Sequence, residues 1–383
     1  MRSLARPRAG RHRICRKSID PYRLILANNP KAADNARRLP KGTPVPKAHA
    51  LPSAALDPQL LACLRACADG ARLAILRLLA RDAYSVQELA LILGLGQATV
   101  SHHLKTLADA GLLRLQRDGT HRFYRRAPRP TPPGLGDRTL TALFEELDDA
   151  PLSDDLAAGV ATVLAERGAR SQAFFARNAE AFEASQDLIA LPDRYLPLLA
   201  EWLPEQGQSA LEIGPGLGAF LPTLLGRFEQ VWAVDNSEEM LRRCADRLRA
   251  EGHPLPHFYC GAFERLPPGA PVPSAQEVVV LAMVLHHCPT PAQLTAAAAQ
   301  ALAENGSLLI AELSPHEQAW VGDACGDLWL GIEPEQQDHW AAEGGALLEE
   351  RQFLTLRNGF QIHLSRYGRR NPPLGAAEAR STP

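Results

Sequence analysis

The sequence has no long apolar run and no paired cysteines. Its longest uninterrupted apolar segment, Val278 to Leu285, is far shorter than the roughly 20 residues that cross a membrane. The seven cysteines include no Cys-x-x-Cys pair, which excludes a zinc ribbon and a disulfide framework. The basic N-terminus has no apolar stretch longer than Leu24 to Ala27, so it lacks the core of a secretory signal. We therefore expect a cytoplasmic protein with reduced thiols and no membrane association.

Charge is distributed unevenly along the 383 residues. Residues 1–50 contain 13 Lys and Arg against 2 Asp and Glu, and residues 51–130 contain 11 against 6. The remaining residues contain 17 against 35, so the formal net charge of -2 conceals a basic front and an acidic back. A basic front indicates a polyanionic partner, most obviously nucleic acid, and the acidic remainder must serve another purpose. A chain of this length has room for two or three domains.

Composition and periodicity divide the chain into four segments. Residues 1–53 are rich in Arg, Pro and Asn without a sustained apolar period, and we interpret them as a basic disordered tail. A solvated tail or a misplaced translation start is a simpler interpretation than a phosphate-binding arm. Regular helical stripes and alternating runs occupy 54–130, a helical dimerisation and linker region is predicted for 131–190, and a ligand-binding domain for 191–383.

A capping box and a glycine turn delimit two consecutive helices. Ser85, with Glu88 three residues later, has the capping-box arrangement at the start of SVQELALIL, and Gly94 and Gly96 end that helix. The following segment, QATVSHHLKTLADAG, is predicted to be helical until Gly111 ends it. A helix, a short glycine turn and a second helix form a helix-turn-helix.

The second helix, residues 97–110, has an inner and an outer face. At about 100° per residue, Val100, Leu104 and Leu107 share one face and must be buried. Lys105, the only lysine after position 47, lies on the opposite face, where it fits a phosphate contact or a solvated position. Two alternating runs, LLRLQR and THRFYRR, then flank an Asp-Gly pair, which is the strongest short hairpin signal. The pattern predicts a winged helix-turn-helix.

The segments LACLRACADGARLAILRLL (61–79) and SVQELALILGLGQATVSHHLKTLADAGLLRLQRDGTHRFYRR (85–126) resemble the ArsR/SmtB family of dimeric bacterial repressors. The resemblance implies a homodimer on double-stranded operator DNA, with helix 97–110 in the major groove and the wing against the backbone. Short polar side chains beside a basic one can contact base edges, and arginines can contact phosphates. The predicted DNA-binding residues are Gln97, Thr99, Ser101, His102, Lys105, Arg114, Arg117, Arg122 and Arg125.

Metal sensing, which is frequent in that family, is not expected here. The helix that carries paired cysteines in soft-metal sensors has only apolar residues at 89–93. Cys63 and Cys67 could chelate a metal in principle, but they lie on an apolar stripe, where buried structural thiols fit better. The neighbouring residues His102 and His103 diverge by about 100° on a helix and do not converge on one ion. We predict no metal site.

A glycine-rich turn marks the second half of the chain. Ser209 to Ile213 is predicted to be a buried strand, and a turn with Gly214, Gly216 and Gly218 follows it. Leu217, Leu221, Leu224 and Phe228 then indicate a helix face, which completes the first βα unit of a doubly wound sheet. The spacing Gly-x-Gly-x-x-Ala also satisfies the dinucleotide fingerprint, so the loop alone leaves NAD and S-adenosylmethionine as alternatives.

Three neighbouring features favour S-adenosylmethionine. Glu212 precedes the glycines at a position that is usually apolar in NAD folds, and an acid there can bind the ligand's amino group. Asp235 ends the second strand and can accept both ribose hydroxyls, which either ligand requires. The segment from Glu277 to Leu285, predicted to be the fourth strand, and the two histidines after it resemble class I S-adenosylmethionine-dependent methyltransferases.

This resemblance implies an α/β Rossmann-like fold after the α+β winged helix-turn-helix, with S-adenosylmethionine or S-adenosylhomocysteine as ligand. Such enzymes commonly have Asp where this sequence has Ala262, so adenine recognition is expected from the backbone near Phe263. The histidines fit strand-end packing, and a general base is the alternative role. The predicted ligand-binding residues are Glu212, Gly214, Gly216, Gly218, Asp235, Asn236, Ala262, Phe263 and His286, and no catalytic residue is assigned.

The order of the two resemblances, with the segments at 324–331 and 356–361, resembles a proteobacterial group of fused regulators that includes S-adenosylhomocysteine-responsive repressors of methionine-cycle genes. The first hypothesis is therefore a repressor with an adenosyl ligand as effector. The alternative is an active methyltransferase of a small acceptor with a regulatory DNA-binding module. Arsenite methylation is disfavoured, because Cys244 is predicted on the helix after Asp235, away from the pocket.

Overall fold

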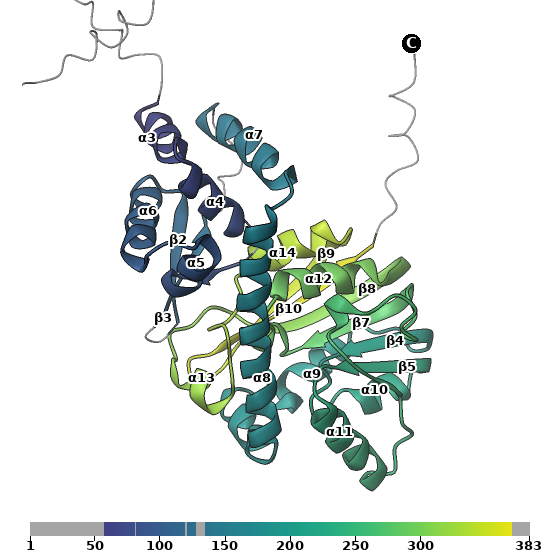
Figure 1. Ribbon diagram of the computed structural model, residues 1–383. Helices are drawn as coiled ribbons and strands as arrows, with labels where there is room; N and C mark the ends of the chain where they lie inside the picture. Colours follow the sequence, from purple (N-terminus) through teal and green to yellow (C-terminus); the bar gives the residue numbers. More distant parts are fainter. Residues whose placement is uncertain (1–56, 81, 119–120, 128–134, 370–383) are drawn as a thin grey trace, which may run out of the picture. The chain divides into compact units, whose positions relative to one another are not determined.

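The computed structural model describes residues 57–80, 82–118, 121–127 and 135–369, which belong to one compact unit. Along the chain, a small region with helices and a hairpin precedes a larger region around a sheet (Figure 1). The predicted basic tail, residues 1–53, lies outside the described residues, as does the tip of the predicted hairpin.

The first region is a winged helix-turn-helix, as the sequence predicted. Its elements are α3 (Pro58–Cys67), α4 (Gly70–Leu78), β1 (Tyr84–Ser85), α5 (Val86–Leu93), α6 (Gln97–Asp109), β2 (Leu113–Asp118) and β3 (His121–Arg126). The strands form an antiparallel sheet in the order β1-β3-β2, in which Leu113 pairs with Arg126 and Asp118 pairs with His121. The β2–β3 hairpin is the wing.

Local hydrogen bonds fix the start of α5. The Ser85 hydroxyl accepts a hydrogen bond from the backbone N–H of Glu88 at 3.2 Å, and the Glu88 carboxylate accepts one from the Ser85 N–H at 2.7 Å. These two bonds confirm the predicted capping box. Gly94 ends the helix with φ +63°, a left-handed conformation that strains residues with a side chain.

Two helices follow the wing, α7 (Leu135–Asp149) and α8 (Asp154–Ile189). Leu140 and Phe144 of α7, and Val163 of α8, belong to the hydrophobic core of the winged region. Helix α8 is one continuous helix (Figure 1). Although α8 is long, no helix in the described part of the chain is both long and apolar enough to cross a membrane.

The second region is a doubly wound α/β fold. Its elements are α9 (Pro192–Ala200), β4 (Gly207–Ile213), α10 (Leu221–Leu225), β5 (Phe228–Asp235), α11 (Glu238–Ala250), β6 (His257–Cys260), η1 (Phe263–Arg265), β7 (Gln276–Ala282), η2 (Leu285–His287), α12 (Pro291–Gln300), β8 (Leu302–Leu313), α13 (Trp320–Ala324), α14 (Pro334–Glu343), β9 (Leu347–Thr355) and β10 (Gln361–Gly368). The seven strands have the order β6-β5-β4-β7-β8-β10-β9. Strands β4 to β8 pair in parallel, and β10 pairs antiparallel with β8 and β9. The predicted Rossmann-like fold is confirmed.

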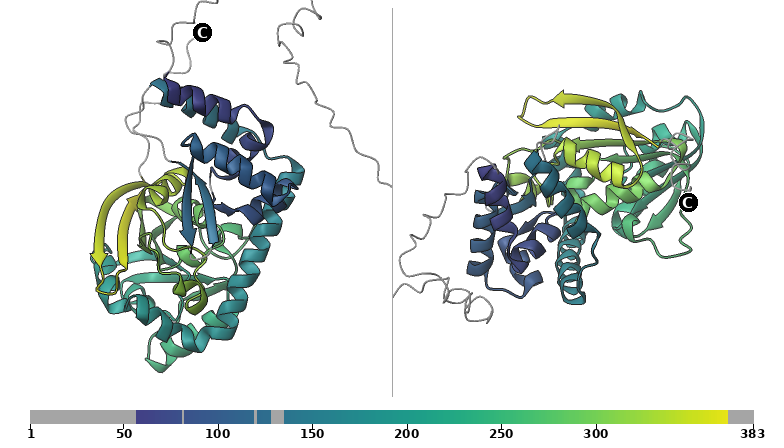
Figure 2. Two further views of the ribbon diagram at one scale, coloured as in Figure 1. Left: turned by 90° about the vertical axis from the view of Figure 1, so that its left-hand side faces the viewer. Right: turned by 90° about the horizontal axis from the view of Figure 1, so that it is seen from above.

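Successive residues of the central strands contact helices on opposite faces of the sheet. In β7, Val278 and Val280 pack in the cluster that includes α9, α10 and α11. Val279 and Leu281 pack in the cluster that includes α12 and α14. Figure 2 shows helices on both faces of the sheet. Both faces are covered, which is typical of parallel strands with continuous apolar sequences.

Two predicted element boundaries are wrong. The helix expected to reach Phe228 is only the short α10, because the chain turns at Gly226 and Phe228 begins β5. The helical spacing of its apolar residues is therefore a coincidence of a loop, a short helix and a strand. The strand expected to reach Leu285 ends at Ala282, because Met283 has φ +59°, which breaks the extended conformation.

Candidate ligand-binding site and DNA interface

The loop after β4 brings backbone, rather than side chains, to one end of the sheet. Gly214 has φ +67°, and a Cβ there would lie 2.8 Å from the side chain of Val284. Gly216 has φ +56°, and no atom lies within 4 Å of the place where its Cβ would be. The first glycine is therefore required for packing, and the second leaves open space in which a ligand can approach the backbone.

A cavity of about 400 Å³ lies beside the carboxyl ends of β4, β5 and β7. Doubly wound folds bind ligands at this end of the sheet. Two predicted residues, Gly218 and His286, do not line the cavity. Gly218 faces the Cys244 thiol, and His287 lines the cavity in place of its neighbour His286. The predicted residues that line it are Glu212, Gly214, Gly216, Asp235, Asn236, Ala262 and Phe263.

Glu212 is an unusual feature of the cavity wall. Its side chain lies in β4 and is only 2% exposed, and burial raises the pKa of its carboxyl group to about 8. The Oε2 atom is buried and makes no hydrogen bond to any other residue that the structure describes. A buried carboxyl group without a donor is unfavourable. A ligand with an ammonium group would supply both a donor and the opposite charge.

Asp235 is the second carboxyl group of the wall. It ends β5, and its Oδ1 accepts a hydrogen bond from the backbone N–H of Ser237 at 2.8 Å. Burial raises its pKa to about 6, against the lowering effect of backbone hydrogen bonds from Ser237 and Asn236. Near neutral pH Asp235 is therefore mostly charged, and its carboxylate can accept hydrogen bonds from ligand hydroxyl groups.

The two histidines after β7 have different surroundings. His286 is 1% exposed, and its Nδ1 lies 2.5 Å from Oε1 of Glu312. Burial lowers the pKa of His286, but the carboxylates of Glu312 and Asp327 outweigh burial and raise it to about 9. His287 lines the cavity, and burial together with the charge of His286 holds its pKa well below 6.5. His286 is therefore a charged packing residue, and the neutral His287 faces the cavity.

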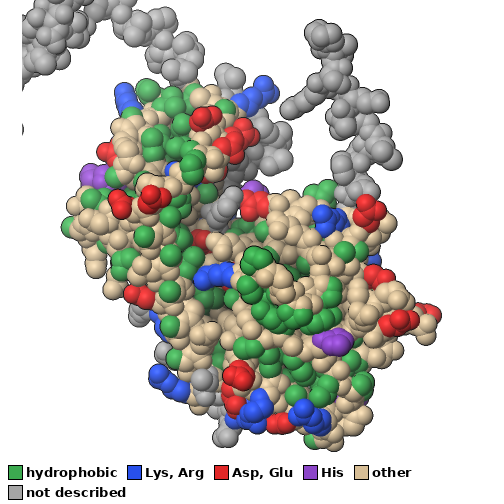
Figure 3. All heavy atoms as spheres, turned by 45° about the vertical axis from the view of Figure 1, so that its right-hand side comes forward, with side chains coloured by type: hydrophobic (Ala, Val, Ile, Leu, Met, Phe, Trp, Pro, Cys, Tyr) green, Lys and Arg blue, Asp and Glu red, His purple; other side chains and the backbone are tan. Residues whose placement is uncertain are grey.

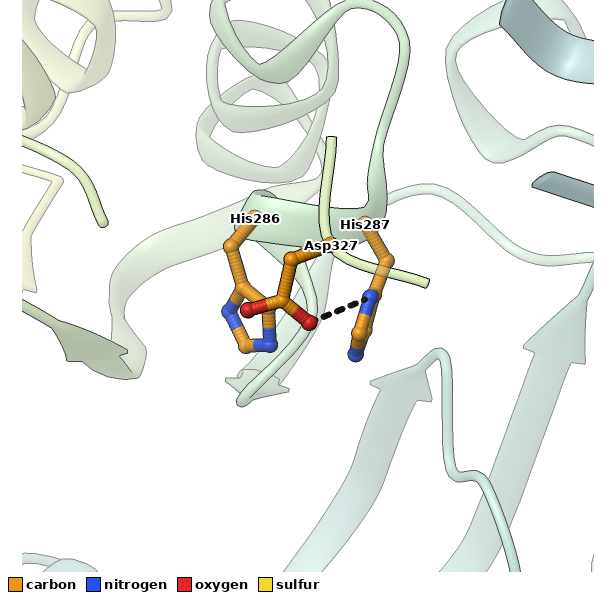
Figure 4. A group of neighbouring side chains, drawn as sticks. All are labelled: His286, His287 and Asp327. Atoms are coloured by element: carbon orange, nitrogen blue, oxygen red, sulfur yellow. Dashed lines mark ion pairs between the residues drawn. The ribbon is translucent and has the colours of Figure 1, made fainter. Parts of the chain in front are cut away.

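Asp327 joins these histidines from a distant part of the sequence. It follows α13, and its Oδ1 lies 3.5 Å from Nδ1 of His287. In Figure 4 the dashed line joins its carboxylate to the ring of His287, and His286 is the neighbouring residue in the chain. One nitrogen or oxygen atom from each of the three residues lies within 4.8 Å of the others. Two imidazoles and a carboxylate are a donor set that can hold a divalent cation. Local spacing does not indicate this group, because it depends on a tertiary contact.

Helix α6 has the two faces that its sequence predicted. Val100, Leu104 and Leu107 are each 0% exposed and form part of the core of the winged region, which confirms the predicted inner face. The polar side chains of the outer face can reach a major groove without rearrangement of the core. The residues predicted to contact DNA from this helix are all exposed: Gln97, Thr99, Ser101, His102 and Lys105.

The wing arginines do not share one environment. Arg114 and Arg122 are exposed, and Arg114 lies 3.7 Å from the carboxylate of Glu333. The side chain of Arg117 lies outside the described part of the structure. Arg125 is only 6% exposed and donates a hydrogen bond to Gln336 of α14. In this structure Arg125 is thus a contact between the wing and α14, and it is not placed to reach a DNA phosphate.

Strand alternation explains the position of Arg125. It points to the same side of β3 as the buried Phe123, and both side chains approach Trp329. The Arg125 guanidinium lies 5.4 Å from the Trp329 ring and 5.7 Å from the Trp340 ring. Arg122 precedes Arg125 by an odd number of residues, so it points to the opposite, exposed side.

On the face drawn in Figure 3, the described basic side chains lie singly or beside acidic ones. Helix α11 has an arrangement of this kind, in which Arg242 pairs with Glu239 at 2.7 Å and with Asp246 at 2.9 Å. Such exposed pairs contribute little to stability. This face, as far as its residues are described, has no continuous basic surface for a polyanion.

Comparison with known proteins identifies two segments. Residues 69–114 match the family described as "Bacterial regulatory protein, arsR family", and residues 211–310 match the family described as "Methyltransferase domain". The chain is 33% identical over 132 residues to the HTH-type transcriptional regulator Rv0324 of Mycobacterium tuberculosis (strain ATCC 25618 / H37Rv). That match covers 34% of this chain and 56% of the relative, so the chain spans little more than half of that protein.

Three solved structures with similarity to the chain each cover about half of it. The magnesium protoporphyrin IX methyltransferase of Synechocystis PCC 6803 with bound SAH is 15% identical, with a TM-score of 0.42, over 52% of this chain and 97% of that one. The N-methyltransferase NodS of Bradyrhizobium japonicum WM9 in complex with S-adenosyl-l-homocysteine is 15% identical, with a TM-score of 0.37, over 50% and 99%. The [4+2]-cyclase SpnF is 16% identical, with a TM-score of 0.40, over 47% and 81%.

Proposed function

Because the chain contains an arsR-family helix-turn-helix region followed by a methyltransferase domain, we propose that it is a DNA-binding transcriptional repressor with an adenosyl effector. The methyltransferase-like domain binds S-adenosylhomocysteine or S-adenosylmethionine, and binding changes the affinity of a homodimer for its operator. The regulated genes are those of the methionine and methyl cycle. The observation that carries the proposal is the buried carboxyl group of Glu212 in the cavity wall, whose Oε2 atom has no hydrogen bond from any described residue.

The cavity residues fit the parts of an adenosyl amino acid. Glu212 would bind the ammonium group of the ligand, and Gly216 leaves open space beside the backbone. Asp235 would accept hydrogen bonds from the ribose hydroxyls, and the wall at Ala262 and Phe263 would contact the adenine. A dinucleotide would instead place its pyrophosphate at the glycine loop beside Glu212, and it has no ammonium group that could pair with this carboxyl group. The cavity therefore favours S-adenosyl ligands over NAD.

DNA binding would use the exposed face of α6 and the exposed part of the wing. The polar residues of α6 would contact base edges, and Arg114 and Arg122 would contact phosphates. Arg117 stays a predicted phosphate contact. A single helix contacts only a few base pairs, so a homodimer on a palindromic operator would supply the remaining specificity. We expect α3 and α7 to form the dimer contact.

The alternative function is methyl transfer to a small acceptor. The observation that favours it is His287, a neutral imidazole in the cavity wall with Asp327 behind it, 3.5 Å away. Such an imidazole could remove a proton from the small molecule that receives the methyl group. Methyl transfer requires mainly alignment and a site without water, so it does not depend on a strong base at this position.

Calorimetry with purified full-length protein tests the proposal. S-adenosylhomocysteine and S-adenosylmethionine should bind the wild-type protein, and Glu212→Gln should weaken both. Glu229→Gln is the matched control, because Glu229 is an exposed residue of β5 outside the cavity. Tight binding of NAD would exclude the proposed ligand, and equal adenosyl binding by Glu212→Gln would exclude Glu212 as the residue that binds the ammonium group. Transfer of labelled methyl groups with no ligand effect on DNA binding would favour the alternative function.

A further inference from the structure

One helix, α8, contacts both the helix-turn-helix and the ligand cavity. Arg167, Ser171 and Phe175 occupy successive turns of this helix, four residues apart, so their side chains lie on neighbouring parts of one surface. Arg167 is 3% exposed and contacts the winged region. Ser171 and Phe175 line the cavity. A short, continuous stretch of helix therefore joins the two sites.

The Arg167 side chain makes a bidentate ion pair with α5. Its Nε donates to Oε1 of Glu88 at 2.7 Å, and its Nη2 donates to Oε2 of Glu88 at 2.9 Å. The same Nη2 donates to the carbonyl of Ala83 at 2.9 Å. Glu88 is also the capping-box residue of α5. A buried guanidinium with this geometry is strongly constrained, because displacement of either partner leaves a charge without compensation.

Direct backbone contact reinforces the junction between α8 and α5. A Cβ on Gly159 of α8 would lie 2.8 Å from the Cα of Ile92 in α5. The two helices therefore pack too closely there for any side chain at position 159. Because interfaces packed in this way do not deform continuously, a shift of α8 has to displace α5 or break the contact.

The cavity end of α8 contacts the turn that follows β7. The Ser171 hydroxyl donates to the carbonyl of His287 at 3.4 Å, and the Phe175 ring meets the His287 ring edge-on at 5.2 Å. The Trp329 Nε1 donates to the carbonyl of Cys288 at 2.7 Å, and the Trp329 ring lies 4.8 Å from the guanidinium of Arg167. His287 and Cys288 both line the cavity. The cavity wall is thus connected to Arg167 by two sets of contacts, one along α8 and one through Trp329.

We propose that Arg167 couples occupancy of the cavity to the helix-turn-helix region. A ligand that displaces the turn at His287 and Cys288 shifts α8 and Trp329, and the Arg167–Glu88 ion pair transmits this shift to α5, which packs beneath the recognition helix α6. Arg167 is a positioning residue, since it does not line the cavity and its guanidinium is buried against Glu88 and Ala83. The inference rests on the proposed effector function and names the residues through which it acts.

A purely structural role for Arg167 predicts different results. If the ion pair only stabilised the fold, its loss would lower the melting temperature and weaken DNA binding equally with and without ligand. If the ion pair couples the two sites, its loss would leave the affinity for DNA alone and the affinity for the adenosyl ligand alone near their wild-type values. The effect of each ligand on the binding of the other would become smaller. The ratio of operator affinities without and with ligand separates these roles.

Two conservative variants and one control are compared by their ratio of operator affinities without and with ligand. Arg167→Lys keeps the charge but loses the bidentate geometry. Glu88→Gln keeps a capping-box side chain but loses the charge, so it provides a second measurement if the first variant folds poorly. Arg126→Lys is the control, because Arg126 makes a comparable pair with Asp148 at 2.6 Å within the winged region and its α7 neighbour.

The experiment uses full-length protein, S-adenosylhomocysteine, and a DNA duplex selected by the wild-type protein from a random library. Ligand binding is measured by calorimetry and DNA binding by fluorescence anisotropy. We expect a wild-type affinity ratio of about 5- to 150-fold and a ratio of about twofold or less in Arg167→Lys and Glu88→Gln. Ligand affinity should stay within about threefold in both variants, and Arg126→Lys should keep the wild-type ratio.

Hydrogen exchange at the amides of α5 provides a second readout. The ligand should change their exchange in the wild-type protein and leave it unchanged in Arg167→Lys. A wild-type ratio in both ion-pair variants would overturn the role of Arg167 and leave the proposed function intact. Loss of ligand binding in Arg167→Lys would place the residue in the binding site and overturn the coupling role. A wild-type protein whose DNA affinity and α5 exchange ignore the ligand would overturn both proposals.

Discussion

Glu212→Gln is expected to make the ligand-free protein more stable and the ligand affinity weaker. Burial raises the pKa of Glu212 from 4.5 to about 8. Between these values the folded, ligand-free protein holds a proton that the unfolded chain has lost, so the free energy of unfolding decreases as the pH rises. At pH 7 the accumulated cost is on the order of 3 kcal/mol. The uncharged Gln removes this cost.

The same change should weaken ligand binding, because a neutral amide cannot pair with an ammonium group. A hydrogen bond to a charged group contributes about 1.5–3 kcal/mol, which corresponds to a loss of roughly 10- to 150-fold in affinity. In the wild-type protein Glu212 must release its proton to bind the ammonium group. Affinity should therefore rise with pH, by at most about tenfold per unit, until the pH reaches about 8.

Scanning calorimetry and titration calorimetry between pH 6.5 and 8 measure both effects. The lower limit keeps Asp235 mostly ionised, since its pKa is about 6. Buffers with different ionisation enthalpies count the protons released on binding. The wild-type protein and Glu229→Gln should release a proton at pH 6.5, and Glu212→Gln should not. Equal binding, equal stability and no proton release across the three proteins would refute the assignment of Glu212.

Three further outcomes are expected. Gln97→Ala or His102→Ala should alter the DNA sequence that the protein prefers. Arg122→Ala should instead weaken binding to all DNA sequences alike and lower the slope of log affinity against log salt concentration by about 1. Uniform weakening in every variant would show that the base and phosphate contacts are misassigned. Asp235→Ala should lower adenosyl affinity by about 1–3 kcal/mol in calorimetry, because ribose hydroxyls lose their acceptor, and unchanged affinity would contradict this role. Elemental analysis of the purified protein should find no stoichiometric zinc, because His286 is already paired with the carboxylate of Glu312. Zinc bound to the wild-type protein and lost in Asp327→Asn would disprove this expectation.

Local sequence spacing was sufficient to predict the features that depend on one element. The inner face of α6 follows from helical periodicity, and the capping box follows from two residues three positions apart. The placement of Glu212 and Asp235 in one cavity wall also followed, because parallel strands end at the same edge of a sheet.

Features that depend on contacts between distant segments were not predictable. Strand alternation places Arg122 and Arg125 on opposite sides of the wing, but only the packing of Trp329 and α14 against one side decides that Arg125 is the buried one. The choice between His286 and His287 depends on where β7 ends, and the positive φ of Met283 ends it earlier than the apolar run suggested. The contact of Asp327 with the histidines has no counterpart in local spacing.

The central claim is that an adenosyl ligand and operator DNA influence each other's binding. Its most direct test is fluorescence anisotropy of a selected DNA duplex with the wild-type protein, without ligand and with saturating S-adenosylhomocysteine or S-adenosylmethionine. S-adenosylhomocysteine should weaken DNA binding more than S-adenosylmethionine does, by about 1–3 kcal/mol of coupling, and DNA should weaken binding of that ligand by the same factor. Operator affinity that is indifferent to both ligands, together with efficient methyl turnover, would contradict the claim and establish the enzyme in its place.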